Sequence, residues 1–306
     1  MFLTLSRLLA GLVAALTVGA PGAPGHPAPP PAAKHPCFEP ADVGAAARGA
    51  TNPRSGDHRA ITPTMQRAIE ARTARILAGR RVSTATVTIP VYVHVMTSKT
   101  GAGNVTTTAI TRQVTVLNQT YSGNDADHPG GVDTGFRFEL AGVDRYANTT
   151  WHADGASETY RAKTRKGGRN ALNIWLVDFG YLGIATFPWD DAGAAGIDGI
   201  RVQYSSLPGG SATHYDEGKT VTHETGHWLG LYHTFQDGCG SPGDEVADTP
   251  AQASPSTGCP TGRDSCTAPG LDPIHNYMDY SYDGCYRSFT AQQVTRMKKM
   301  WAAYRA

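Results

Sequence analysis

The segment that constrains this chain most is T-H-E-T-G-H-W-L-G-L-Y-H-T, residues 222–234, which carries three histidines and one glutamate. On a helix, His223 and His227 lie one turn apart on the same face, so their imidazoles can bind one zinc ion. Glu224 lies beside them, within reach of a water molecule on such a metal. The segment therefore predicts a helix that presents two metal ligands and a base.

The third histidine excludes a straight helix through the whole segment. At about 1.5 Å per residue, His233 would lie roughly 9 Å further along the axis than His227, too far for one ion to hold both. The helix must therefore end or bend between them, and Gly230 can take the left-handed conformation of a helix end. The alternative is a histidine-rich amphipathic helix without metal, and both the glycine and the third histidine weigh against it.

Charge and composition limit the partners of the chain. The 306 residues carry 27 Lys and Arg against 26 Asp and Glu, a near-neutral balance that gives no case for a nucleic-acid partner. Only 17% of the residues are charged, whereas glycine and proline are abundant. This composition favours a loop-rich extracellular protein of one large or two small domains over a helical bundle.

Residues 1–20 have the pattern of a secretion signal. Arg7 lies in a short n-region, residues 8–18 are apolar, and Val18-Gly19-Ala20 is a small-residue cleavage site. The apolar run is shorter than the roughly 20 residues that a membrane span needs. We therefore expect a secreted, extracellular protein without a membrane anchor after signal removal.

The five cysteines divide into one upstream residue and a cluster of four. The cluster contains no C-x-x-C pair, which disfavours a four-thiolate zinc site, and spacing alone leaves three disulfide pairings open. Its members are Cys239, Cys259, Cys266 and Cys285. Cys37 lies far upstream and has no obvious partner.

The N-terminal third divides at residue 85. Residues 21–36 are rich in proline and read as an extended linker, and a helix is predicted over 64–78, capped by Thr64. We interpret residues 21–85 as a linker with a propeptide or N-terminal extension. The alternative is that this segment is a structural part of the mature domain.

From residue 86 onward the order of the predicted elements is that of an α+β or mixed α/β domain. The basic cluster at 161–169 is expected to be a solvated loop, with a cleavage site for a basic-specific protease as the alternative. Residues 235–288 are expected to be a loop-built region pinned by disulfides. A last helix at 290–304 begins with the capping-box pair Thr290 and Gln293. The other predicted elements are strands at 86–97, 136–143, 172–179, 183–187 and 199–204, and helices at 108–121 and 219–230.

A second motif, H-N-Y-M-D-Y at 275–280, follows some forty residues after His233. Met278 would form an apolar floor beneath the three histidines if it lies in a tight turn there. Tyr280 could direct its hydroxyl toward a developing oxyanion. The alternative for Met278 is an ordinary buried methionine in a disulfide-rich loop.

Taken together, these motifs resemble the pappalysin family of metzincin zinc endopeptidases, in particular its small secreted microbial members. The resemblance covers roughly residues 86–306. It rests on V-T-H-E-T-G-H-W-L-G-L-Y-H-T-F at 221–235, G-D-E-V-A-D-T-P at 243–250 and N-Y-M-D-Y at 276–280.

The resemblance implies a metzincin-type zincin fold and a catalytic zinc. Such a fold has an upper half with a twisted five-stranded sheet and two long helices, and an irregular lower half. Residues 183–187 would match the edge strand that pairs with an extended substrate. The implied disulfides are Cys239–Cys266 and Cys259–Cys285.

The resemblance also suggests three further features, each with an alternative. Calcium could bind the oxygen donors of the loop after the zinc motif, namely Asp244, Asp248 and Thr249, which are otherwise acidic loop residues without an ion. Cys37 could be a latency switch on the zinc, or else a free thiol. Asp283 could favour Arg or Lys after the cleaved bond, or be a surface acid in a turn.

The expected function is that of a secreted zinc endopeptidase acting on proteins or peptides as a monomer. His223, His227 and His233 would hold zinc, Glu224 would serve as general base, and Tyr280 would stabilise the oxyanion. One rival is a zinc hydrolase of non-peptide amides or an exopeptidase. The other is a non-catalytic secreted binding protein with a structural zinc, for which Glu224 would have no use.

Overall fold

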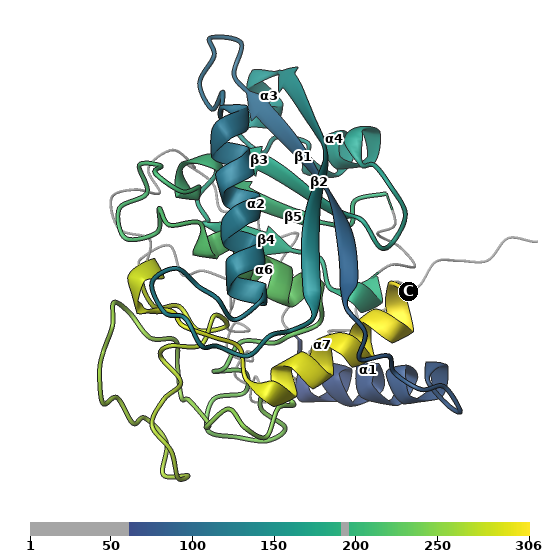
Figure 1. Ribbon diagram of the computed structural model, residues 1–306, viewed down its shortest axis with the longest axis vertical. Helices are drawn as coiled ribbons and strands as arrows, with labels where there is room; N and C mark the ends of the chain where they lie inside the picture. The colour runs from purple at the N-terminus through teal and green to yellow at the C-terminus, as the bar shows by residue number, and fades with distance from the viewer. Residues whose placement is uncertain (1–60, 191–195) are drawn as a thin grey trace, which may run out of the picture. The chain divides into compact units, whose positions relative to one another are not determined.

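The computed structural model describes residues 61–190 and 196–306, and these form the predicted α+β fold around one sheet. The sheet has five strands in the order β2-β1-β3-β5-β4 (Figure 1). The first four of these run parallel to one another, and the edge strand β4 is antiparallel to β5. The strands are β1 (Val87–Thr97), β2 (Phe136–Ala147), β3 (Leu172–Val177), β4 (Gly183–Ala185) and β5 (Ile200–Gln203).

Two helices, α2 (Thr107–Tyr121) and α6 (Lys219–Trp228), pack together and against the sheet. The hydroxyl of Tyr121 donates to the carbonyl of Thr222 over 3.2 Å, which fixes one helix against the other. All ten residues of α6 are buried, although many of them are polar. The core thus encloses the helix that carries the predicted metal ligands.

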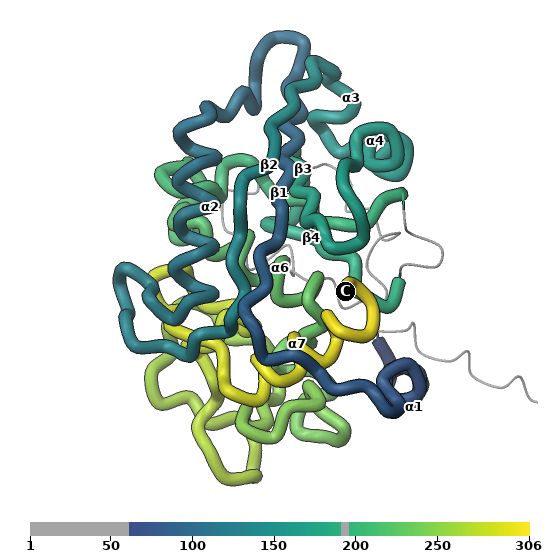
Figure 2. The backbone as a smooth tube through the Cα atoms, turned by 45° about the vertical axis from the view of Figure 1, so that its right-hand side comes forward, coloured from purple at the N-terminus to yellow at the C-terminus, as the bar shows by residue number. Residues whose placement is uncertain are grey.

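The helices at the two ends of the described chain, α1 (Pro63–Ile76) and α7 (Ala291–Tyr304), lie side by side (Figures 1 and 2). Thr62 caps α1, so the predicted cap at Thr64 was wrong by two residues. Proline is well suited to the first helical position, and Pro63 occupies it. At α7 the predicted capping box of Thr290 and Gln293 is confirmed.

The basic cluster at 161–169 was only partly predicted. Its first residues belong to α4 (Ser157–Thr164), which follows the short helix α3 (Thr149–His152). Arg161 is buried and donates to the carbonyl of Ile197 over 3.1 Å, and Arg165 pairs with Asp198. The expectation of a solvated loop therefore holds only for the residues after Arg165.

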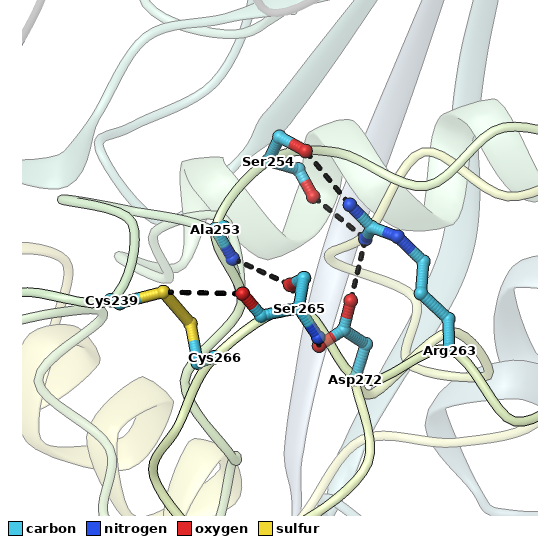
Figure 3. The surroundings of a disulfide bond; sticks show 7 residues. All are labelled: Cys239, Ala253, Ser254, Arg263, Ser265, Cys266 and Asp272. Carbon is cyan, nitrogen blue, oxygen red and sulfur yellow. Dashed lines mark hydrogen bonds and ion pairs between the residues drawn. A yellow bond between two sulfur atoms is a disulfide. The ribbon is translucent and has the colours of Figure 1, made fainter.

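Residues 235–288 form the irregular half that the sequence predicted, with both disulfides in the implied pairing. Near Cys239–Cys266, Arg263 pairs with Asp272 at 2.7 Å (Figure 3). The described residues also contain 3-10 turns at Pro188–Asp190, Tyr204–Ser206 and Asp283–Cys285. In the described ranges, no helix combines the length and the apolar character needed to cross a membrane.

Candidate metal centre

The end of α6 places the third histidine. Helix α6 ends at Trp228, and Gly230 has a φ of 98°, in the left-handed region predicted for it. The amide of Leu231 donates to the carbonyl of Gly226, and that of Gly230 to the carbonyl of His227. This is the hydrogen-bond pattern of a Schellman helix end. It turns the chain sharply, as the position of His233 requires.

The turn brings the three histidines together. The Nε2 atom of His227 lies 3.1 Å from Nε2 of His223 and 2.9 Å from Nε2 of His233. Ligand nitrogens about 2.0–2.1 Å from a tetrahedral zinc are separated by roughly 3.3 Å, close to these distances. The three rings therefore converge on one point, as the sequence predicted.

The remaining ring nitrogens show which tautomer is present. Nδ1 of His223 donates to the carbonyl of Tyr277 over 2.6 Å, and Nδ1 of His227 donates to the carbonyl of Leu231 over 2.8 Å. A carbonyl only accepts, so each Nδ1 carries the proton and each Nε2 presents a lone pair. Burial lowers the pKa of His227 to about 4 and that of His223 well below its usual range. His223 and His227 are thus neutral imidazoles whose Nε2 lone pairs face the same point, and the His233 ring lies at that point as well. This arrangement suits a metal cation.

Glu224 follows His223 on α6 and lies in the protein interior. Its side chain is fully buried, and neither carboxylate oxygen has a hydrogen-bond partner among the described residues. Burial raises the pKa of Glu224 well above its usual range, while Arg201 opposes this shift. A carboxylate of this kind has a high proton affinity and two acceptors available for a water molecule.

The second motif lies at the same site. Met278 is fully buried with its sulfur against Gly226 of α6, and its carbonyl accepts from the amide of Thr234 over 3.2 Å. The ring of Tyr280 lies 4.9 Å from that of His233 and 5.7 Å from that of His223, between centroids. The structure thus brings both predicted residues to the three histidines.

Asp283 lies near the site and, contrary to the alternative of a surface acid in a turn, is buried and hydrogen-bonded. It is buried, and its Oδ2 accepts from the amides of Glu217 and Lys219 at the start of α6, over 2.9 and 3.3 Å. Burial raises its pKa to about 7 despite these two donors. The lining of an adjacent small cavity includes Asp283 and His223, together with Tyr215, Lys219, Thr220 and Tyr286.

The three residues predicted to bind calcium do not share one cluster. Thr249 donates to Asp244 over 2.7 Å within the loop. Asp248 instead accepts from Thr290 and from the amide of Gln292 at the start of α7, using both carboxylate oxygens. Cys37 lies outside the described residues.

No role at the metal site was predicted from the sequence for Gly183, Tyr277 or Asp125. Gly183 of β4 lies so close to Glu224 that a β-carbon there would overlap the glutamate side chain. Tyr277 supplies the carbonyl that orients His223, and its hydroxyl donates to Asp125 over 2.6 Å. Asp125 also pairs with Lys219 at the start of α6. In the sequence, only its position next to Met278 could have indicated that Tyr277 lies at the site.

Among the described residues, one further group of potential ligands stands close together, namely Cys259, His275 and Cys285. Both of its sulfurs are joined in the disulfide Cys259–Cys285, so this group offers no thiolate. The three histidines are therefore the candidate metal centre of the described chain.

Comparison with known proteins gives a consistent result. Residues 179–302 match a family described as Pregnancy-associated plasma protein-A. An extracellular metalloprotease of Neurospora crassa is 46% identical over 245 residues, which are 78% of this chain and 82% of that protein.

Two solved structures are also similar over most of their length. A promirolysin mutant of Tannerella forsythia matches with a TM-score of 0.67 and 30% identity, covering 78% of this chain and 88% of that one. Mature mirolysin of the same organism, in complex with a cleaved peptide, matches with a TM-score of 0.61 and 32% identity, covering 70% and 91%.

Proposed function

This chain belongs to the pappalysin family of metallopeptidases, and on that premise we propose that His223, His227 and His233 hold its catalytic metal and that Glu224 is its general base. The chain is an extracellular metallo-endopeptidase whose substrates are proteins or peptides. Family membership disfavours the non-catalytic binding protein. We infer zinc as the metal, because three imidazoles whose Nε2 atoms converge at close to tetrahedral ligand spacing form a typical catalytic zinc site.

The observation that supports this assignment most is that Glu224 lies on the same helix as His223 and His227, next to the point where the three Nε2 atoms converge. A bound zinc ion supplies Lewis acidity and makes water nucleophilic near neutral pH. Glu224 accepts the proton of the attacking water and returns it to the leaving amine. Its burial without a partner among the described residues leaves both oxygens available for this transfer.

We assign two supporting residues to the same reaction. Tyr280, whose ring lies against His223 and His233, donates its hydroxyl proton to the developing oxyanion as a hydrogen bond. Met278 forms an apolar floor beneath the three histidines. Its fully buried side chain packs against Gly226 and thereby supports the position of α6, which carries two of the three rings. Edge strand β4 is antiparallel to β5 and offers its outer edge to an extended substrate.

Replacing Glu224 by alanine tests the assignment. Glu224→Ala should retain the metal and lose almost all cleavage of a protein substrate, whereas a metal chelator should abolish the cleavage of the wild-type protein. A variant that cleaves at near wild-type rate would show that another group is the base. Release of only terminal residues, or activity limited to non-peptide amides, would favour the rival hydrolase.

For substrate preference, we propose that Asp283 favours Arg or Lys after the cleaved bond. Its buried carboxylate shares a small cavity with the metal-site residue His223, and a basic side chain there would pair with it. Cleavage of a peptide library by wild type and by Asp283→Asn measures this. An unchanged cleavage preference in the variant would contradict a role of Asp283 in specificity, and its role would then be limited to the hydrogen bonds at the start of α6.

We also propose calcium in the loop at 244–249. The support is Asp244, whose buried carboxyl has a pKa raised by burial to about 6 and would gain from a cation. Calcium should then raise the melting temperature of the wild-type protein more than that of Asp244→Asn. Equal shifts in both proteins would remove the proposal.

The N-terminal predictions also remain proposals, namely a signal at 1–20, a propeptide or extension at 21–85 and a catalytic domain at 86–306. Cys37 is proposed to keep the precursor latent, and Cys37→Ala should then be active before any processing. An inactive Cys37→Ala precursor would contradict this. Action as a monomer is expected as well, and light scattering on the purified protein measures it.

A further inference from the structure

The chain segment that carries the third histidine is contacted by residues of α7 and of the α1 region, which are not part of the metal site. This return segment, residues 230–236, leads from Gly230 through His233 to Gln236. Arg296 of α7 donates from Nε to the carbonyl of Gly230 over 2.8 Å. Its guanidinium carbon also lies 4.7 Å from the centre of the Tyr232 ring. One arginine thus contacts the return segment on both sides of Leu231.

Helix α1 holds that arginine. Glu70 accepts from Nη1 of Arg296 over 2.8 Å with one carboxylate oxygen, and from Nζ of Lys299 over 2.6 Å with the other. Arg296 is 5% exposed and Glu70 21% exposed, so this pair is shielded from water more than a surface ion pair is. Glu70 therefore orients the guanidinium that holds Gly230.

The same helix region contacts the far end of the return segment. Gln236 donates from its amide to the carbonyl of Ile61, just before α1, over 2.9 Å. Between the two ends, Tyr232 packs in an apolar cluster that both terminal helices share. The buried members of this cluster are Ile61, Ile69, Trp189, Tyr232, Met300 and Tyr304.

We propose that residues 61–76 are a positioning element for the third metal ligand, with Glu70 acting through Arg296 on the turn at Gly230. The proposal rests on the metal site proposed above, and it treats residues 61–76 as an extension that belongs to the mature domain, not as part of a removed propeptide. A metal ligand must be held within about 0.5 Å of its productive position, and His233 follows the turn by three residues. A change in the direction of the chain at Gly230 therefore moves the His233 imidazole relative to the other two.

A purely stabilising role for α1 makes a different prediction. Lys299 pairs with the same glutamate from the same helix, but none of its hydrogen bonds or ion pairs reaches the return segment. Loss of Lys299 should weaken the contact between α1 and α7 without disturbing Gly230. Lys299→Met is thus a matched control for variants that break the connection to the turn.

The experiment measures zinc affinity in the full chain by competition with a chromophoric chelator, for Glu70→Gln, Arg296→Lys and Lys299→Met. Outer partners of metal ligands change metal affinity by about 10–100-fold when lost. We expect the zinc dissociation constant to rise about tenfold in Arg296→Lys, which cannot contact Gly230 and Glu70 as a fork. It should rise several-fold in Glu70→Gln and stay at the wild-type value in Lys299→Met.

Cobalt(II) gives a second readout that stability does not affect. The visible spectrum of the cobalt-loaded protein reports the ligand geometry, so it should change in Arg296→Lys and Glu70→Gln and not in Lys299→Met. Equal affinities and spectra in all three variants would overturn the proposal. If Arg296→Lys does not fold, Glu70→Gln decides alone.

Two further proteins separate this proposal from the metal site itself. The wild-type chain should bind zinc and His233→Ala should bind it far more weakly. If wild type binds no zinc, or His233→Ala binds it equally well, the site assignment fails and this proposal fails with it. If those two behave as expected and Glu70→Gln equals Lys299→Met, only the role of α1 is refuted.

Discussion

At the scale of single residues, the site depends on how closely the protein packs around Glu224. Its side chain extends toward Gly183 of β4, where there is no space for a β-carbon. Among the described residues, the charge that opposes the effect of burial on the pKa of Glu224 is that of Arg201, which is itself buried and paired with Asp154. The glycine thus determines where the carboxylate can lie.

Gly183→Ala should lower kcat by roughly 10–100-fold while the protein keeps its metal. The added methyl group displaces the Glu224 carboxylate, and a displacement of about 1 Å from a reactive geometry has effects of that size. Steady-state kinetics with metal analysis measure both quantities. Gly142→Ala is the control, since Gly142 lies in β2, where the added methyl would meet only the Tyr92 ring. Equal kinetics in the two variants would contradict this role of Gly183.

Asp283 gives a prediction for pH dependence. Burial raises its pKa in the folded protein to about 7, whereas an aspartate in an unfolded chain has a pKa near 4. Between these values the folded state holds a proton that the unfolded state has released, so this residue lowers stability as the pH rises from about 4 to about 7.

Asp283→Asn should remove that loss. We expect the variant to exceed wild type in free energy of unfolding at pH 8 and to lose this advantage toward pH 4, as urea unfolding at several pH values would show. The asparagine oxygen can still accept from the amides of Glu217 and Lys219. A difference between the two proteins that does not change with pH would contradict the raised pKa.

Which site residues could be predicted depends on their separation along the chain. The three histidines and Glu224 lie within one short segment, and helix geometry alone brings three of these four residues together. Gly183 and Asp125 come from a strand and a loop far upstream. Their proximity to α6 is a result of tertiary packing, which the spacing of residues does not encode.

At the scale of elements, the end of α6 is the decisive feature. Gly230 takes a φ of 98°, and a β-carbon there would meet the side chain of Met300 and approach that of Pro188. The turn therefore requires glycine both for its backbone conformation and for the close approach of α7. Both requirements act on the residue that starts the return segment.

Gly230→Ala should destabilise the protein by about 2–5 kcal/mol, the sum of left-handed strain and overpacking. Gly209→Ala is the matched control, because Gly209 also has a positive φ but no atom within 4 Å of an added β-carbon. That control should lose only about 1–2 kcal/mol. Urea unfolding measures both, and equal losses would show that contact with Met300 has no effect.

The elements that sequence patterns predicted well are those with local signals. Helices α2 and α7 were predicted to within one residue, since apolar spacing and the capping box are encoded in adjacent residues. Helix α4 was missed because it is short and polar and begins after Ala156, which makes no side-chain cap. The burial of Arg161 depends on a carbonyl 36 residues away.

At the scale of the whole molecule, the C-terminal end of α7 is joined to the end of α6, the helix that carries two of the three histidines. Arg305 donates to the carbonyl of Trp228, the last residue of α6, over 2.9 Å and pairs with the buried Asp198. Asp198 also pairs with Arg165, and the positive charge and hydrogen bonds of Arg305 hold its pKa below the usual range against the effect of burial. The penultimate residue thus joins α7 to α6 and to the loop before β5.

Arg305→Met should therefore cost about 3 kcal/mol in free energy of unfolding, toward the lower end of values for a broken buried ion pair because Arg165 remains. Lys166→Met removes an exposed, solvent-screened pair with Asp144 and should cost far less than the loss of Arg305. Chemical denaturation measures both. A loss in Arg305→Met as small as that in Lys166→Met would show that the C-terminal contact contributes little.

The central claim concerns one point in space, where three imidazoles meet because the chain turns at Gly230. Anomalous diffraction at the zinc absorption edge, from crystals of the zinc-loaded protein, tests it directly. We predict one peak about 2.0–2.1 Å from Nε2 of His223, His227 and His233. A peak elsewhere, or one that only two of these histidines coordinate, would contradict the account.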